Sequence, residues 1–290
     1  LYWSQYDFTK IPFDDIVSVG QRTLLYRDLF SISWLLGRFC NYKCSYCWPY
    51  ARSDKKDHRP TALNLATIDE IKKQARENGF NSFHFSLSGG EPTFHPGYLD
   101  MLQHLADDVE NTNYTSVHMT TNMSRNMKWH QEYCDIVAQV HRASITASFH
   151  SEFAKKEEFA DKLLFCMEHD IQVTVNMVLV PEWFDRDWDV AMYFHKRGIN
   201  VTLKPQSDPT ASFVVDGYTK EQLVMMQNGM PQRDYTKVLQ KETGIKVVRP
   251  KPKVGMWKMD AQNGDDKSVP PVMQVEFQDS KGKKWYMDQA

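Results

Sequence analysis

Residues 29–47 read LFSISWLLGRFCNYKCSYC and join two different signals. Residues 29–36 are rich in apolar and aromatic side chains and stop at Gly37, which predicts a buried strand. Three cysteines follow, Cys40, Cys44 and Cys47, with the spacing C-x3-C-x2-C. A strand that runs straight into this loop places three thiols at its carboxyl end.

Three thiolates on one short loop can converge on one metal centre, and they suit zinc or an iron–sulfur cluster. A structural zinc site normally takes four protein ligands. Here the next histidine is His58, and no second cysteine pair follows the loop. A cubane cluster held by three cysteines would leave one iron without a protein ligand, free to take a small molecule. The loop by itself leaves both a zinc-stabilised structural module and an iron–sulfur site open.

The composition is that of an ordinary globular protein, with 290 residues of which 41% are hydrophobic and 25% charged. Lys plus Arg number 35 and Asp plus Glu 37, a formal charge of −2, so no nucleic-acid partner is expected. The best apolar stretch, residues 29–39, contains Arg38 and is too short to span a bilayer. Five cysteines and no visible signal peptide favour a reducing, cytoplasmic setting.

Strand and helix patterns alternate through the chain after the cysteine loop. Further strands are predicted at 82–88, 115–120, 143–149, 172–180 and 200–204. Helices are predicted between them, at 68–79 (from the capping-box pattern of Thr67 and Glu70), 97–110, 129–139, 152–169 and 185–197. Six alternating units predict an α/β protein with a parallel sheet, either doubly wound or closed into a partial barrel. In both architectures the functional residues lie at the carboxyl edge of the strands.

The two ends of the chain are less regular. We expect an N-terminal extension over 1–28, a core over 29–206 and a C-terminal extension over 207–290. The last of these has a predicted helix at 219–230 and a small hairpin that pairs 273–277 with 284–286.

The cysteine loop, with aromatic Tyr46 before its last cysteine, resembles the signature of the radical S-adenosylmethionine (radical SAM) superfamily. A second motif, Ser88-Gly-Gly-Glu-Pro92, follows the second strand and resembles the family's motif for the methionine amino group of the cofactor. The resemblance selects a (βα)6 partial TIM-type barrel with a C-terminal extension. It implies a [4Fe–4S] cluster on Cys40, Cys44 and Cys47, with S-adenosylmethionine on the open iron.

The resemblance also implies contacts beyond the cluster. Two glycines at a strand end let a ligand approach the backbone closely, although a tight turn with an exposed acid is the alternative. The predicted cofactor-binding residues are Tyr46, Gly89, Gly90, Glu91, Pro92, Thr121, Asn122, Ser148 and Asn176, and the candidates for substrate contact are Trp48, His150 and Lys204. For the strand-end residues the alternative is a local hydrogen bond to the backbone. No catalytic residue is assigned, and Cys134 and Cys166 are predicted to be inert core thiols.

The implied activity is that of an oxygen-sensitive radical SAM enzyme. Such an enzyme cleaves S-adenosylmethionine reductively to a 5′-deoxyadenosyl radical, which abstracts hydrogen from the substrate, here expected to be a peptide or a small metabolite. The implied electron donor is a reductant such as flavodoxin or ferredoxin. Two alternatives remain: an iron–sulfur electron-transfer protein, against which the Gly-Gly-Glu turn argues, and a zinc-stabilised module. Similar enzymes often carry a cysteine-rich C-terminal domain with auxiliary clusters, and no cysteine follows Cys166. The sequence leaves open whether such a domain lies beyond Ala290, and it does not fix the substrate, the reaction outcome or the oligomeric state.

Overall fold

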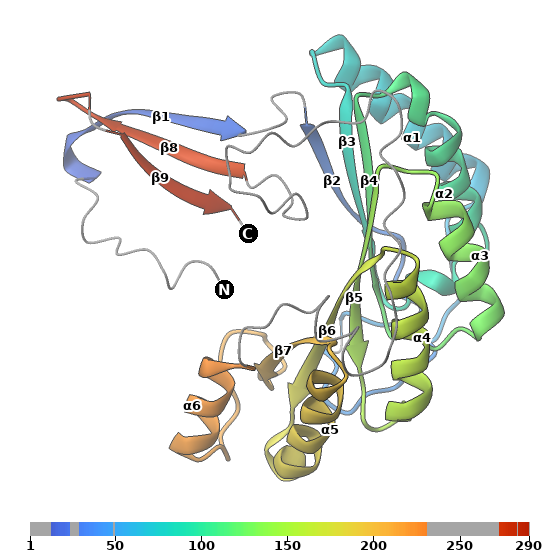
Figure 1. Cartoon of the computed structure of the whole chain (residues 1–290), viewed down its shortest axis with the longest axis vertical. Coiled ribbons are helices and arrows are strands. Elements are labelled where there is room, and N and C mark those ends of the chain that lie inside the picture. Colours follow the sequence, from blue (N-terminus) through green and yellow to red (C-terminus); the bar gives the residue numbers. More distant parts are fainter. Residues whose placement is uncertain (1–12, 24–28, 49, 231–272, 283, 290) are drawn as a thin grey trace.

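Two sheets organise the computed structural model, which describes residues 13–23, 29–48, 50–230, 273–282 and 284–289 (Figure 1). The larger sheet is parallel and contains β2 (Leu29–Leu35), β3 (Ser82–Ser88), β4 (Tyr114–Thr121), β5 (Arg142–Phe149), β6 (Gln172–Leu179) and β7 (Asn200–Pro205). The helices that connect these strands are α1 (Thr61–Glu77), α2 (Tyr98–Asp107), α3 (Met127–Val137), α4 (Lys156–Glu168) and α5 (Phe184–Lys196).

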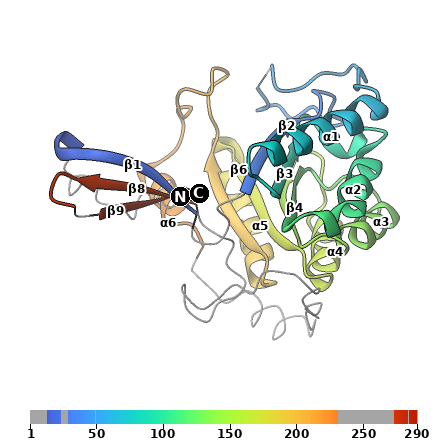
Figure 2. The same ribbon diagram turned by 90° about the horizontal axis from the view of Figure 1, so that it is seen from above.

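The order of the strands decides between the two architectures that the alternation allows. Every strand from β2 to β7 lies beside its successor, in the order β2-β3-β4-β5-β6-β7. A doubly wound sheet reverses its winding direction part-way, which would place helices on both faces. Here the helices lie along one face of a curved sheet, as Figures 1 and 2 show. The fold is therefore the (βα)6 partial barrel.

The face of the sheet that packs against the helices is apolar. Along β5, Ala143, Ile145, Ala147 and Phe149 are buried, whereas the alternate residues are only half-buried. Successive side chains of a strand point to opposite faces, so the half-buried set lies on the concave face. Phe83, Phe85 and Leu87 make the same pattern on β3. The hydrophobic core therefore lies between the sheet and its helices.

The concave face is polar. The rings of His84 and His118 reach across to the next strand, where His84 Nδ1 lies 2.8 Å from Ser116 Oγ and His118 Nδ1 lies 2.8 Å from Ser144 Oγ. The interior of a closed TIM barrel is usually filled by bulky branched side chains. In this open barrel, hydrogen-bonding side chains occupy much of that face instead.

The six predicted core strands are confirmed, and two predicted helix starts are wrong. α1 begins at Thr61, seven residues before the expected start, because Thr67 is not a cap: its hydroxyl donates to the Leu63 carbonyl at 2.7 Å inside the helix. α4 begins at Lys156 rather than at 152. Residues 152–155 consequently belong to the loop that follows β5.

The second sheet joins the two ends of the chain. β8 (Met273–Asp279) and β9 (Lys284–Gln289) form the predicted hairpin, and β1 (Ile16–Thr23) pairs antiparallel with the other edge of β8. β1 is not among the strands predicted from the sequence. α6 (Lys220–Asn228) is confirmed, and Thr219 caps it in a capping box with Gln222. Within the described ranges, no helix is both long enough and apolar enough to cross a membrane.

Candidate functional site

The cysteine loop leaves β2 at the carboxyl edge of the sheet and lies against the turn that follows β3. The Leu36 N–H donates to the Ser88 carbonyl at 2.9 Å, the Gly90 N–H to the Gly37 carbonyl at 2.9 Å and the Glu91 N–H to the carbonyl of Phe39 at 2.7 Å. These backbone bonds extend the pairing of the two strands into their loops. The two sequence motifs therefore form one structural unit.

The two glycines of the turn permit this close approach. A Cβ atom on Gly89 would lie 2.4 Å from the Gly37 carbonyl oxygen, and one on Gly90 would lie 2.3 Å from that of Phe39. Gly89 also has φ +148°, which other residues rarely adopt. The sequence predicts these glycines as a point where a ligand approaches the backbone. The structure adds a second requirement, because the start of the cysteine loop occupies the space that their side chains would take.

Glu91 is buried, with 2% of its surface exposed. Its carboxylate accepts hydrogen bonds from the hydroxyls of Thr93 at 2.6 Å and Thr121 at 2.7 Å, and from the Asn122 N–H at 2.6 Å. Burial raises the pKa of this carboxyl, against the hydrogen bonds, which lower it. Pro92 follows as the first residue of a short 3-10 helix that Glu91 caps. The Glu91 side chain thus ties the turn after β3 to the end of β4.

Asn122 continues this connection to the cysteine loop. Its amide Nδ2 donates to Asn41 Oδ1 at 3.0 Å and lies 3.9 Å from Cys40 Sγ. Asn41 also donates to Ser124 Oγ at 3.0 Å. Thr121 and Asn122, both predicted site residues, therefore lie where they join Glu91 to the first cysteine.

The other half of the cysteine loop is held by the loop after β5. Tyr46 Oη lies 2.7 Å from His150 Nδ1, and the two rings are stacked. Burial raises the pKa of Tyr46 and lowers that of His150 to about 4, so at neutral pH the phenol is protonated and the imidazole uncharged. A protonated phenol can donate to the bare Nδ1 of a neutral ring. Both residues are sequence predictions, and the structure brings them together.

Three further contacts in this region were not predicted from the sequence. Glu152 accepts hydrogen bonds from the backbone N–H and the hydroxyl of Ser45, and the ring of Phe153 stacks on Tyr42 with 4.8 Å between centroids. The sequence pattern places Glu152 at the start of a predicted helix. The sequence signal for Glu152 was its place in the loop just after the end of a predicted strand, where His150 also lies.

The remaining predicted residues are more spread out. Ser148 on β5 pairs in register with Asn176 on β6, and both lie on the concave face. Lys204 on β7 pairs with Val178 and is exposed. Trp48 is 39% exposed and stacks on Tyr50 beside the cysteine loop. These side chains border the same edge of the sheet. Of these residues, Trp48 also contacts a cysteine, since its carbonyl oxygen lies 3.8 Å from Cys47 Sγ.

The donor set of the loop fits a metal cluster. Cys40, Cys44 and Cys47 are half-buried free thiols. Burial raises the pKa of all three, that of Cys44 to about 12, and Glu152, Cys40 and Cys47 add to the rise at Cys44. A group of buried thiols with raised pKa values ionises when a metal centre binds to it, because the positive charge of the metal stabilises the thiolates. Among the described residues, no three His, Cys, Asp or Glu side chains surround a single ion position. In a cubane each cysteine binds a separate iron, so that arrangement is not required.

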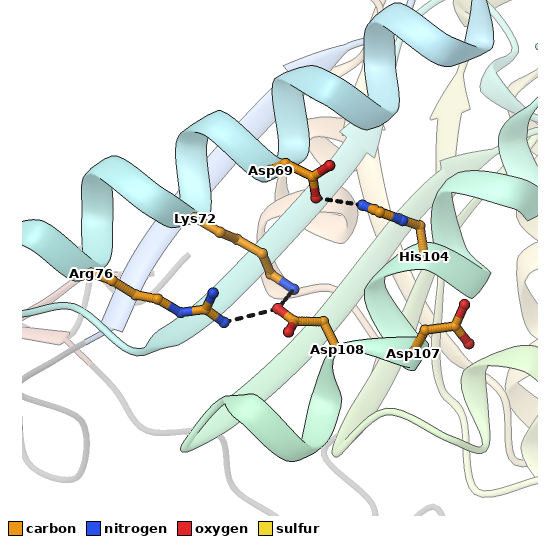
Figure 3. A pocket seen from close by; sticks show the side chains of 6 residues that line it. All are labelled: Asp69, Lys72, Arg76, His104, Asp107 and Asp108. Carbon is orange, nitrogen blue, oxygen red and sulfur yellow. Dashed lines mark hydrogen bonds and ion pairs between the residues drawn. The ribbon is translucent and has the colours of Figure 1, made fainter.

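A hollow of about 280 Å³ lies elsewhere, between α1 and α2 (Figure 3). Most of its charged groups are paired with one another: Lys72 and Arg76 each lie 2.8 Å from Asp108, and His104 lies 2.6 Å from Asp69, whereas Asp107 accepts from Gln103. These pairs join two helices on the outside of the barrel. We assign them to stability rather than to chemistry.

Comparisons with known proteins agree with this geometry. The family model described as "Radical SAM superfamily" matches residues 34–194, more than half of the chain. No curated protein sequence matches. Solved structures with a similar fold include "Native anSMEcpe with bound AdoMet", at 15% identity and a TM-score of 0.48, covering 62% of this chain and 52% of that one. A second, "Native anSMEcpe with bound AdoMet and Kp18Cys peptide", has 17% identity and a TM-score of 0.45 over the same shares.

The chain thus spans about half the length of these structures. The family match begins within β2, ends within α5 and contains both the cysteine loop and the turn after β3. The chain therefore belongs to the radical SAM superfamily, which implies a [4Fe–4S] cluster and S-adenosylmethionine as its cofactors.

Proposed function

We propose that Cys40, Cys44 and Cys47 hold the [4Fe–4S] cluster and that the enzyme acts on a peptide or a small metabolite. The observation that carries the proposal is the joining of three free cysteines to the Gly-Gly-Glu-Pro turn through backbone hydrogen bonds. When bound, the cluster and S-adenosylmethionine supply reductive cleavage of the sulfonium and hydrogen-atom abstraction from the substrate. The electron would come from a reductant of the flavodoxin or ferredoxin type.

The turn after β3 is the proposed contact for the methionine end of S-adenosylmethionine. Because the Glu91 carboxylate is engaged by Thr93, Thr121 and Asn122, we assign this contact to the backbone of Gly89, Gly90 and the residues after them. Glu91 itself would hold the turn in place. Thr121 and Asn122 would hold Glu91 in place from the end of β4, and Asn122 would also contact the first cysteine.

The remaining cofactor contacts are proposed along the carboxyl edge of the sheet. Ser148 and Asn176 lie side by side on the concave face and would meet the ribose or the adenine. Tyr46 would pack near the adenine while its hydroxyl stays bonded to His150. His150 would then serve mainly to position Tyr46.

The substrate would enter at the concave face, past Trp48 and Lys204. The polar side chains of that face, including the neutral ring of His118, whose pKa burial lowers to about 4, favour a hydrophilic organic substrate. The catalytic unit in this proposal is the core over 29–206, between the N-terminal (1–28) and C-terminal (207–290) extensions.

The test is anaerobic reconstitution of the full chain with iron and sulfide, followed by addition of dithionite and S-adenosylmethionine. The proposal predicts a brown protein that forms 5′-deoxyadenosine. Colour without that product would indicate an electron-transfer protein, and bound zinc without colour would indicate a structural module. Cys44→Ala should abolish both colour and product, whereas Cys134→Ala, at a buried thiol in α3, should retain both.

A further inference from the structure

A carboxylate from the loop after β5 lies directly against the backbone of the cysteine loop. Both oxygens of Glu152 lie within hydrogen-bond distance of the Ser45 N–H, at 3.0 and 3.1 Å, and one also accepts the Ser45 hydroxyl at 2.8 Å. Ser45 is joined to Cys44 by a peptide bond and is two residues from Cys47. The carboxylate therefore lies against the short segment between two proposed cluster ligands.

Two physical effects follow from this position. Hydrogen bonds from backbone N–H groups to the cluster sulfurs make reduction easier, since they stabilise the added negative charge. The Ser45 N–H is turned toward a carboxylate instead. In addition, a fixed negative charge near the cluster opposes the arrival of an electron. Both effects lower the reduction potential of the cluster.

The basic residues of the loop region have partners other than Glu152. Lys43 and Arg52 both pair with Asp54, at 3.5 and 2.8 Å, and Arg38 donates to the Arg52 carbonyl at 3.4 Å. Glu91 is a further carboxylate, and it is buried on the other side of the loop, toward β4. His150, the closest titratable neighbour of Glu152 in the chain, pairs with Tyr46.

We propose that Glu152 is a positioning residue that fixes the Cys44–Cys47 half of the loop and lowers the reduction potential of the bound cluster. The inference rests on the proposed function, because it requires the three cysteines to hold that cluster. A low potential serves the reaction, since the electron must pass on to a sulfonium that is difficult to reduce. The residue acts through Ser45 and through its charge, without contact with the substrate.

The test compares Glu152→Gln with wild type in the reconstituted full-length enzyme. Glutamine keeps an oxygen that can accept from Ser45 but carries no charge, so we expect the variant to retain its iron and to show a more positive midpoint potential in an EPR-monitored redox titration. Glu152→Ala loses the hydrogen bonds as well, and we expect a shift in the same direction together with faster loss of iron to a chelator. Glu157→Gln, the same change at an exposed position on α4, should leave the potential unchanged.

The outcomes separate this inference from the proposed function. A cluster-free wild-type enzyme would overturn both. A wild-type cluster whose potential is the same in Glu152→Gln as in Glu157→Gln would overturn only the role of Glu152. Loss of the cluster from both Glu152 variants, with Glu157→Gln intact, would show a purely structural role and would also overturn the effect on potential.

Discussion

At the scale of single residues, Glu91 is the side chain on which both motifs depend. It accepts four hydrogen bonds from two different segments, and little water reaches it. Glu91→Ala would leave the Thr121 hydroxyl and the Asn122 N–H buried without their acceptor. We expect a loss of about 3 kcal/mol in the free energy of unfolding, because each buried unsatisfied donor costs roughly 1–3 kcal/mol. Urea denaturation of the cluster-free protein measures this loss.

Glu70→Ala provides the matched control, since Glu70 is an exposed residue of α1. Its effect should stay within about 0.5 kcal/mol, as for most surface substitutions. Equal stability losses in the two variants would contradict the role assigned to Glu91.

The residues that could be predicted from the sequence are those whose role shows in local spacing. Cys40, Cys44 and Cys47 lie in one short loop, and Gly89 and Glu91 are adjacent to a strand end. Glu152 could not be found in this way, because its partner Ser45 lies 107 positions earlier and only the tertiary fold brings the two together. Its assignment to a helix concealed it further.

At the scale of secondary-structure elements, α1 and α2 are joined by the ion pairs of Asp108. Burial raises the pKa of this carboxyl, but hydrogen bonds from Lys72, Asn111 and Arg76 outweigh that effect and lower the pKa to about 2. A carboxyl whose pKa is lowered by folding stabilises the protein at every pH above its pKa in the unfolded chain, here about 3.8. This contribution is lost as the pH falls through the pKa of the folded state. We therefore expect Asp108 to contribute fully at pH 5 and to lose most of its contribution near pH 2.

The measurement is the urea midpoint between pH 5 and pH 2, for wild type, Asp108→Asn and Asp135→Asn. Asp135 is an exposed residue of α3 and controls for the loss of a carboxylate as such. The wild-type and Asp108→Asn curves should converge as the pH falls. Parallel curves over that range would show that Asp108 contributes no pH-dependent stability.

Helix boundaries provide a second prediction at this scale. Asn126 is the cap of α3, and its side chain accepts the Trp129 N–H at 3.0 Å. Asn126→Ala should cost about 1 kcal/mol, the usual value for loss of an N-cap. Thr67, which resembles a cap in the sequence, lies inside α1 and bonds back to Leu63, so Thr67→Ala should change stability by no more than about 0.5 kcal/mol. Thermal or urea unfolding of the two variants measures these losses of stability. A larger loss for Thr67→Ala than for Asn126→Ala would indicate that Thr67 acts as the N-cap expected from the sequence.

Boundaries of this kind are difficult to predict because local signals are ambiguous. The Thr67–Glu70 pattern has the composition of a capping box. The helix nevertheless begins at Thr61, directly after Pro60, so that Thr67 lies inside it. Strands were easier, since Phe83, Phe85 and Leu87 alternate with polar residues against a buried face.

At the scale of the whole molecule, the parallel direction of the six core strands could be predicted once each was recognised, because strands that alternate with helices form parallel neighbours. The choice of a partial barrel came only from the resemblance of the two motifs to a known family, since alternation alone permits both a barrel and a doubly wound sheet. The pairing of β1 with β8 was also beyond local reasoning, since about 250 positions separate residues such as Gln21 and Val275, which lie opposite each other.

This long-range pairing gives the last prediction. β8 is the central strand of the second sheet, with β1 on one side and β9 on the other. Removing residues 1–23 deletes β1 and turns β8 into an edge strand, whose backbone N–H groups lose their partners on one side. Hydrogen exchange followed by mass spectrometry should then show faster exchange in 273–279, while 114–121, the interior strand β4 of the barrel, exchanges as in the full chain. Unchanged exchange in 273–279 would mean that the hairpin is stable without β1 and that the two ends of the chain do not depend on each other.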